Sequence, residues 1–227
     1  MTNRKVAVVT GASSGIGRAS ARALAAKGYE VVCAARRLDR IEELAREIDG
    51  RAVQCDVTNR EDVERLAAEA GPRVDVLVAN AGGAFGTDPV ASADLDDWRR
   101  MYEINVLGTL STIQTTLPAL EAAHGVIITI GSTAGIVSYE GGAGYCGSKH
   151  AVRALMGALR LELFDKPVRV CEIDPGMANT EFSTFASRTS VPSAPGAAIV
   201  NSRPFVVPQS SSRMMTSCET STSRRVR

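Results

Sequence analysis

The feature of the sequence that most constrains the fold is a regular alternation of short apolar runs with longer amphipathic stretches. The short runs are rich in β-branched residues and predict strands, whereas the longer stretches carry apolar residues at helical spacing. The predicted strands span residues 6–10, 30–35, 51–55, 74–79, 126–131 and 169–173, and the predicted helices span about 15–27, 38–48, 59–69, 95–121 and 144–164. This alternation predicts an α/β fold, a doubly wound parallel sheet with helices on both faces.

The bulk composition fits one globular domain of this kind. The chain has 227 residues, of which 44% are hydrophobic and 22% are charged, and its formal net charge is +1. No apolar run reaches the length of about 18 residues that a membrane span needs, and the N-terminus lacks the apolar core of a signal peptide. We therefore expect a cytoplasmic protein with no membrane partner.

The composition changes after Ser183. Residues 183–227 are rich in Ser and Thr, contain six arginines and a single acidic residue, Glu219, and show no helical or strand period. We expect a Rossmann-type catalytic domain over residues 1–182 and an irregular tail over 183–227. Arginines scattered without interleaved aromatic residues are a weak signal for nucleic-acid binding, so no such partner is expected.

The cysteines and histidines do not predict a metal site. The five cysteines are odd in number and not closely paired, and two of them, Cys33 and Cys171, fall in strands predicted to be buried. His124 and His150 have no metal-ligand spacing around them. We expect reduced thiols, no disulfides and no metal.

A glycine-rich turn follows the first predicted strand and precedes an alanine-rich helix. Gly11 permits a tight turn, Gly15 lets the backbone approach a pyrophosphate, and Gly17 allows close packing of the helix on the sheet. The N-terminal amides of that helix then face the phosphates. The expected contacts of a dinucleotide cofactor here are Thr10, Gly11, Ser13, Ser14, Gly15, Ile16 and Gly17.

Two arginines follow the second predicted strand, where an acidic residue would bind the free 2'-hydroxyl of an adenosine ribose. The guanidinium groups of Arg36 and Arg37 can instead pair with a 2'-phosphate. The alternative is that both arginines are only solvated. The sequence favours NADP(H) over NAD(H).

Several motifs, taken in order and spacing, resemble the short-chain dehydrogenase/reductase family. They are TGASSGIG at 10–17, NAG at 80–82, Asn105, Ser132 and YCGSK at 145–149. The resemblance covers about residues 4–183 and implies an oxidoreductase that interconverts a small alcohol and its carbonyl. A further likeness to the 3-hydroxy acid and serine dehydrogenase branch lies in IGSTAG at 130–135, YEGGAGY at 139–145 and IDPGMANTEFS at 173–183.

The resemblance also implies cofactor contacts beyond the glycine-rich turn. The expected residues are Asp56 and Val57 at the adenine, Asn80, Ala81 and Gly82 beside the central strand and the ribose, and Pro175, Gly176 and Thr180 at the nicotinamide end. One departure from the family pattern is Ala79, which stands where a first asparagine is usual. We expect this change to affect rigidity rather than chemistry.

Tyr145 and Lys149 are four residues apart on a predicted helix, so their side chains share one face. A free tyrosine has a pKa of about 10 and is a poor base at neutral pH. A nearby ammonium, together with a positively charged nicotinamide, lowers that pKa, so Tyr145 is expected to act as general acid or base. Lys149 is also expected to hold the nicotinamide ribose.

Two further residues complete the expected catalytic set. Ser132 follows a predicted strand, at the sheet edge where ligands bind, and its hydroxyl can orient the substrate oxygen. The resemblance implies that Asn105 bends the long helix and holds a water that links Lys149 to solvent.

The family normally continues with a lid helix, another long helix and a final strand, which the tail does not predict. We hypothesise a frameshifted or otherwise altered C-terminus. Three functions therefore remain open, namely a working reductase, a cofactor-binding protein that senses the nicotinamide ratio, and an inactive truncated product.

The two longest predicted helices carry apolar and small residues on more faces than one sheet can bury. On the second of them these residues are Ala151, Ala154, Leu155, Gly157 and Ala158. The family commonly assembles through such helices. We expect a homodimer or a homotetramer.

Overall fold

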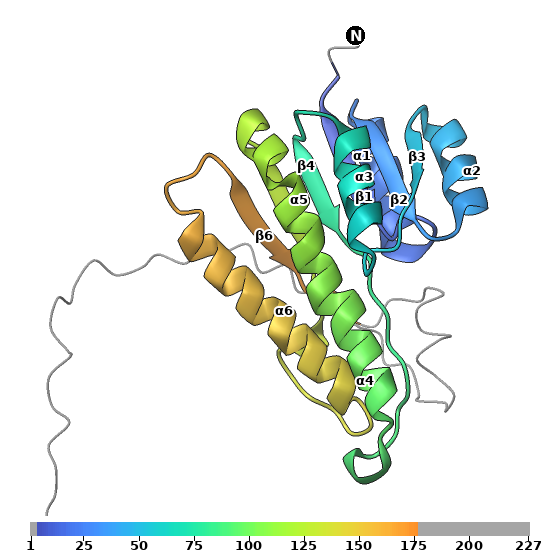
Figure 1. The fold of residues 1–227 in the computed structure, drawn as a ribbon, viewed down its shortest axis with the longest axis vertical. Coiled ribbons are helices and arrows are strands. Elements are labelled where there is room, and N and C mark those ends of the chain that lie inside the picture. Colours follow the sequence, from blue (N-terminus) through green and yellow to red (C-terminus); the bar gives the residue numbers. More distant parts are fainter. Residues whose placement is uncertain (1–3, 177–227) are drawn as a thin grey trace, which may run out of the picture.

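The computed structural model describes residues 4–176 and shows a single parallel sheet of six strands, in the order β3-β2-β1-β4-β5-β6 (Figure 1). The strands are β1 (Val6–Thr10), β2 (Glu30–Ala35), β3 (Arg51–Gln54), β4 (Val76–Ala79), β5 (Val126–Ile130) and β6 (Arg169–Ile173). The α-helices are α1 (Gly15–Ala26), α2 (Leu38–Ile48), α3 (Arg60–Ala70), α4 (Leu95–Tyr102), α5 (Gly108–Ala123) and α6 (Ala143–Glu162). The predicted doubly wound fold is confirmed, and the predicted tail 183–227 lies outside the described residues.

The strand order places a switch point between β1 and β4. The chain leaves β1 toward β2 and β3 on one side and returns to β4, β5 and β6 on the other. Because all six strands are parallel, their carboxyl ends meet at one edge of the sheet, and ligands bind outside such a switch point. The turns after β1, β4, β5 and β6 carry most of the residues expected in the site.

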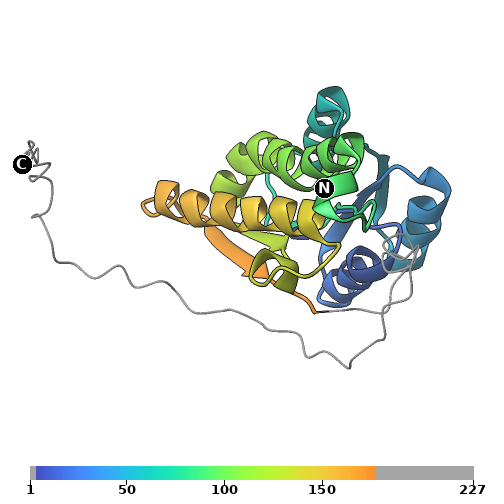
Figure 2. The same ribbon diagram turned by 90° about the horizontal axis from the view of Figure 1, so that it is seen from below.

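Apolar side chains fill two layers, one on each face of the sheet. Helices α3, α5 and α6 contribute Leu66, Leu120 and Met156 to one layer, while α1 and α2 contribute Ala21 and Leu44 to the other. Figure 2 shows α5 and α6 side by side on one side of the sheet and α1 on the opposite side. Burial on both faces explains why the strands appear in the sequence as nearly continuous apolar runs.

The boundaries differ from the prediction mainly in the long helix 95–121. The structure divides it into α4, a π-helical turn η2 (Glu103–Leu107), and α5. Two short 3-10 turns, η1 (Val90–Ser92) and η3 (Thr133–Gly135), were not predicted. The apolar periodicity did not reveal the π turn because a single extra residue in one turn hardly changes that pattern.

The cysteines within residues 4–176 are free thiols. Cys33, Cys55 and Cys146 are buried, and burial raises the pKa of both Cys33 and Cys55 to about 12. The prediction that Cys171 is buried is wrong, because it lies exposed on β6, the last strand of the sheet as described. The same residues contain no group of three or more side chains suited to a metal ion.

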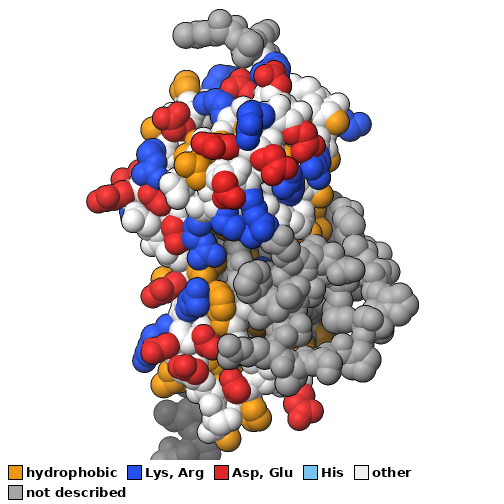
Figure 3. Space-filling view, turned by 90° about the vertical axis from the view of Figure 1, so that its right-hand side faces the viewer, with side chains coloured by type: hydrophobic (Ala, Val, Ile, Leu, Met, Phe, Trp, Pro, Cys, Tyr) orange, Lys and Arg blue, Asp and Glu red, His pale blue; other side chains and the backbone are white. Residues whose placement is uncertain are grey.

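The surface carries charges of both signs. Figure 3 shows acidic and basic side chains intermingled on the face in view. Pairs such as Arg18 with Glu43 at 2.8 Å and Arg22 with Glu47 at 2.6 Å join α1 to α2. None of the helices between residues 4 and 176 combines the length and the apolar character needed to cross a membrane.

Substitution of two helical glycines by alanine should have opposite effects on stability. A Cβ at Gly17 would collide with the backbone oxygen of Gly11, whereas a Cβ at Gly157 would meet no atom within 4 Å. We expect Gly17→Ala to lower the free energy of unfolding by about 1–3 kcal/mol through overpacking. Gly157→Ala should raise it by about 1 kcal/mol through helix propensity.

Urea unfolding of both variants, followed by circular dichroism, provides the measurement. Equal effects of the two substitutions would show that α1 does not pack on the turn as closely as the structure indicates.

Candidate active site

The turn after β1 is tied to the turn after β4 by side-chain hydrogen bonds. The Thr10 hydroxyl accepts hydrogen bonds from the backbone amides of Asn80, at 3.0 Å, and Ala81, at 3.1 Å. The Asn80 amide group donates to the carbonyl oxygens of Thr10, at 2.9 Å, and Gly11, at 3.3 Å. The NAG motif therefore supports the glycine-rich turn, and Ala79, buried in β4, leaves this support intact.

The glycine-rich turn has the geometry of an anion cradle. Gly11 and Gly15 adopt positive φ angles of 66° and 54°, a backbone conformation that residues with a Cβ rarely adopt. Ser14 precedes α1 but makes no side-chain capping hydrogen bond, and the first turn of α1 has no acidic residue. The uncapped, positively polarised end of α1 thus suits the phosphates of a dinucleotide.

The two arginines after β2 differ in position. The Arg37 guanidinium donates to the hydroxyls of Ser13 and Ser14, both at 2.9 Å, so it lies against the glycine-rich turn. Arg36 is exposed, and its carbonyl oxygen accepts a hydrogen bond from Gln54. Of the two residues expected to bind a 2'-phosphate, Arg37 is the one that the structure brings to the turn.

Asp56 and Val57 follow β3 at the same edge of the sheet. The Asp56 carboxylate accepts hydrogen bonds from the amide and the hydroxyl of Thr58, at 3.0 and 2.8 Å. Val57 is buried and packs against Gly108, the first residue of α5. The adenine contacts expected of both residues stay predictions.

Ser132, Tyr145 and Lys149 come together at the carboxyl end of β5. A side-chain hydrogen bond joins Ser132 and Tyr145. The Lys149 ammonium donates to the carbonyl oxygen of Ile130 at 2.9 Å and lies 5.8 Å from the centre of the Tyr145 ring. A hydroxyl, a phenol and an ammonium thus form one cluster, as expected for proton transfer to or from a substrate oxygen.

Burial dominates the electrostatics of this cluster. It raises the pKa of Tyr145 to about 12, although the hydrogen bond with Ser132 acts in the opposite direction. Burial also lowers the pKa of Lys149 to about 8, against the charges of Glu172 and Asp174, which raise it. Within the protein alone, Lys149 therefore does not lower the pKa of Tyr145 below its ordinary value.

Asn105 lies in the π turn and is buried. Its side-chain oxygen accepts from the amide of Gly83 at 2.8 Å, and its nitrogen donates to the carbonyl oxygen of Gly83 and to the Ser148 hydroxyl, both at 2.9 Å. Ser148 in turn donates to the carbonyl oxygen of Tyr145 at 2.8 Å. The Asn105 side chain thus connects the turn after β4 to α6, and a water-holding role stays a prediction.

The remaining expected contacts lie after β4 and β6. Gly82 is exposed beside the Asn105 side chain. The carbonyl oxygen of Pro175 accepts from the amide of Thr133 at 3.1 Å, which places the Pro175–Gly176 turn beside Ser132. Thr180 lies outside the described residues.

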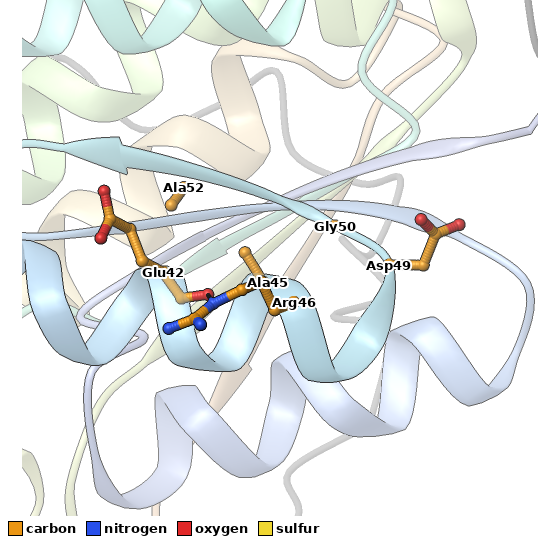
Figure 4. A pocket seen from close by; sticks show the side chains of 6 residues that line it. All are labelled: Glu42, Ala45, Arg46, Asp49, Gly50 and Ala52. Carbon is orange, nitrogen blue, oxygen red and sulfur yellow. Dashed lines mark hydrogen bonds between the residues drawn. The ribbon is translucent and has the colours of Figure 1, made fainter.

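A surface hollow between α2 and β3 contains none of these residues (Figure 4). Its lining residues are Glu42, Ala45, Arg46, Asp49, Gly50 and Ala52. They offer no nucleophile or proton-relay cluster, so the hollow is not a candidate active site.

Comparison with known proteins agrees with the geometry at the sheet edge. The family model described as short chain dehydrogenase matches residues 5–190. The chain belongs to the short-chain dehydrogenase family. An uncharacterized oxidoreductase of Mycobacterium tuberculosis is 56% identical over 183 residues, which cover 80% of this chain and 72% of that protein.

Two relatives have more specific names. The NADP-dependent 3-hydroxy acid dehydrogenase of Schizosaccharomyces pombe is 38% identical over 191 residues, covering 79% of this chain and 73% of the relative. The closed form of a serine dehydrogenase complexed with NADP+ superposes with a TM-score of 0.75 at 37% identity, covering 79% of this chain and 75% of that one. The resemblance to this branch of the short-chain dehydrogenases is confirmed.

The sequence did not single out two residues that contact the candidate catalytic set of this short-chain dehydrogenase. Ser148 links Asn105 to the backbone of Tyr145, and Asp174 accepts a hydrogen bond from the backbone amide of Ser132 at 3.1 Å. Ser148 directly precedes Lys149 in the YCGSK motif, and Asp174 directly precedes Pro175 in the IDPGMANTEFS motif. That adjacency was the only signal for them.

Substitution of Asn105 predicts a large loss of stability. Asn105→Ala would remove the partner of the half-buried amide and carbonyl of Gly83 and of the buried hydroxyl of Ser148, so we expect the free energy of unfolding to fall by about 2–4 kcal/mol. Asn59→Ala is the control, because Asn59 only caps α3 and its loss costs about 1 kcal/mol. Chemical denaturation measures both, and equal losses would contradict the connecting role of Asn105.

Proposed function

We propose that this short-chain dehydrogenase uses NADP(H) to interconvert a small secondary alcohol, or a 3-hydroxy acid, and its carbonyl. The observation that carries the proposal is the cluster of Ser132, Tyr145 and Lys149 at the carboxyl end of β5. This cluster lies at the same sheet edge as the glycine-rich turn. The 3-hydroxy acid and serine dehydrogenases among the relatives support the substrate class.

The chain's own residues handle the proton and orient the substrate. Ser132 donates a hydrogen bond that orients the substrate oxygen, and Tyr145 gives a proton to that oxygen during reduction or takes it during oxidation. Lys149 stabilises the phenolate of Tyr145 with its charge. The bound nicotinamide supplies the hydride chemistry and, in its oxidised form, a positive charge that favours the phenolate.

Arg37 supports the choice of NADP(H). Its guanidinium is oriented by two serine hydroxyls of the glycine-rich turn, and a planar guanidinium can pair with a phosphate through two hydrogen bonds. The turn therefore presents positive charge where the adenosine ribose of a Rossmann-type cofactor is expected. The exposed Arg36 adds a second cation beside it.

We also propose that residues 1–182 form the catalytic domain and that the protein works as a homodimer or homotetramer. Exposed apolar side chains on α4 support assembly, since Leu95 and Tyr102 are 63% and 47% exposed. Large apolar side chains in contact with water are typical of interfaces when they gather on one element. The cytoplasmic location expected from the sequence stays a prediction.

The two other functions considered make different predictions about turnover. A cofactor-sensing protein binds NADPH without turnover, and an inactive truncated product binds it weakly or does not fold. The complete set of Asn105, Ser132, Tyr145 and Lys149 favours the working enzyme, because a sensor has no need of a proton relay.

Removal of the Tyr145 hydroxyl tests the mechanism. We expect Tyr145→Phe to lower kcat for reduction of 3-oxo acids by a factor of about 100 or more, because the general acid is lost. NADPH binding, followed by nicotinamide fluorescence, should change little. Tyr29→Phe is the matched control, since Tyr29 directly precedes β2 at the opposite edge of the sheet, and equal loss of turnover in both variants would contradict the assignment.

Removal of the Arg37 guanidinium tests the cofactor preference. Arg37→Ala should weaken NADPH binding by a factor of about 10–100, the equivalent of one or two charge-assisted hydrogen bonds, and leave NADH binding nearly unchanged. Arg22→Ala, on the surface of α1, should affect neither. Equal weakening of both cofactors in Arg37→Ala would contradict a 2'-phosphate contact.

A further inference from the structure

Two buried carboxylates lie at the end of β6, next to the catalytic cluster. The side chains of Glu172 and Asp174 are 6% and 3% exposed. They are two residues apart at the end of one strand, so they point to the same face of the sheet. Burying two acids side by side is unfavourable unless positive charge or hydrogen bonds compensate for the lost hydration.

Asp174 binds the backbone at Ser132 as part of a continuous series of contacts. The amide of Gly131 donates to the carbonyl oxygen of Ile173 at 2.8 Å, and the amide of Thr133 donates to that of Pro175 at 3.1 Å. Between them, the amide of Ser132 donates to the carboxylate of Asp174 at 3.1 Å. A side chain thus replaces the main chain as acceptor at the residue that hydrogen-bonds to Tyr145.

The carboxylates also lie close to the backbone next to Lys149. A Cβ at Gly131 would collide with the Asp174 carboxylate and would lie 2.9 Å from the Glu172 carboxylate. Lys149 is anchored one residue earlier, on the carbonyl oxygen of Ile130. The two acids and the ammonium therefore surround the same end of β5.

Other charged groups around the pair do not neutralise it completely. Arg153 on α6 contacts Asp174 at 3.3 Å, and Arg160 on the same helix contacts Glu172 at 3.7 Å, but both arginines are partly exposed. One carboxylate oxygen of Glu172 is buried without a hydrogen-bond partner. Burial and the neighbouring charge of Asp174 raise the pKa of Glu172, and both carboxylates in their ionised form act on Lys149, the buried cation of the cluster.

We propose that Asp174 is a positioning residue for the reaction, which fixes the backbone of Ser132 and, together with Glu172, keeps Lys149 in its cationic form. The inference rests on the proposed dehydrogenase function. It assigns a role to two acids that the cluster of Ser132, Tyr145 and Lys149 does not include. Each acid acts through a neighbouring residue, Asp174 through the amide of Ser132 and both acids through the charge of Lys149.

The direction of the pH effect follows from the charges. Lys149 carries its charge below its pKa, which burial has lowered to about 8 and which both carboxylates raise. Removing either carboxylate lowers that pKa further, so a larger fraction of Lys149 becomes neutral near neutral pH. The alkaline limb of the profile of kcat/KM against pH should then move to lower pH.

The test observes Lys149 directly. The chain has four lysines, Lys5, Lys27, Lys149 and Lys166, so lysine labelled with 13C at Cε gives a simple NMR spectrum in which Lys149→Ala identifies the signal of Lys149. We expect Asp174→Asn and Glu172→Gln each to move the titration of this signal to lower pH. Glu162→Gln, an exposed acid about 20 Å further along α6, is the control and should leave it unchanged.

Kinetics separate the positioning role from the charge. Asp174→Asn keeps an oxygen that can accept the Ser132 amide, whereas Asp174→Ala removes both charge and acceptor. We expect Asp174→Ala to lower kcat at neutral pH by a further factor of about 10–100 relative to Asp174→Asn. Circular dichroism verifies folding, and if Asp174→Ala does not fold, the charge-only variants still decide the test.

An unchanged titration of Lys149 in both charge-only variants would overturn the proposal, as would wild-type kcat in folded Asp174→Ala. Failure of the proposed function has a different signature, which is absence of turnover by the unmodified chain with NADPH and 3-oxo acids. The NMR titration is independent of turnover, so the two failures are distinguishable.

Discussion

The structure of the site depends on the tie between the ends of β1 and β4. The hydroxyl of Thr10 accepts hydrogen bonds from the two backbone amides that follow β4. The Asn80 side chain donates two hydrogen bonds to backbone carbonyl oxygens at the turn after β1. These strands are neighbours in the sheet, yet the chain leaves them in opposite directions. The tie therefore holds the glycine-rich turn at the point where the crevice opens.

A second connection extends from the turn after β4 to α6, the helix that carries Tyr145 and Lys149. Asn105 binds both backbone groups of Gly83, and through Ser148 it reaches the carbonyl oxygen of Tyr145. The π turn between α4 and α5 is the local distortion in which Asn105 lies. Distortions of this kind are common at functional sites, where a regular helix would point the side chain elsewhere. The glycine-rich turn, the turn after β4 and α6 are thus joined by one set of hydrogen bonds.

Electrostatics at the end of β5 balances burial against charge. Burial disfavours both the Tyr145 phenolate and the Lys149 ammonium, and only groups that complement those charges can restore them. The two acids at the end of β6 stabilise the charged form of Lys149, and a cationic nicotinamide would stabilise the phenolate of Tyr145. The proton transfer that we propose therefore draws on groups from three separate segments.

The sequence by itself determined the alternation of strands and helices, the glycine-rich turn and the set of Asn105, Ser132, Tyr145 and Lys149. Asn105 and Ser132 were singled out with the help of the resemblance to short-chain dehydrogenases, whereas the strands, the helices and the pairing of Tyr145 with Lys149 on one helix depend on local periodicity and spacing. For the same reason, the sequence placed most boundaries within two residues of those observed.

Only the tertiary structure decided which contacts join the elements. It separated Arg37, held by Ser13 and Ser14, from the exposed Arg36, although the two are adjacent in the chain. It also brought Asp174 to Ser132 across 42 positions of sequence. The physical reason is that hydrogen bonds and buried charges depend on distances between segments, which strand order and register set and which no local pattern contains.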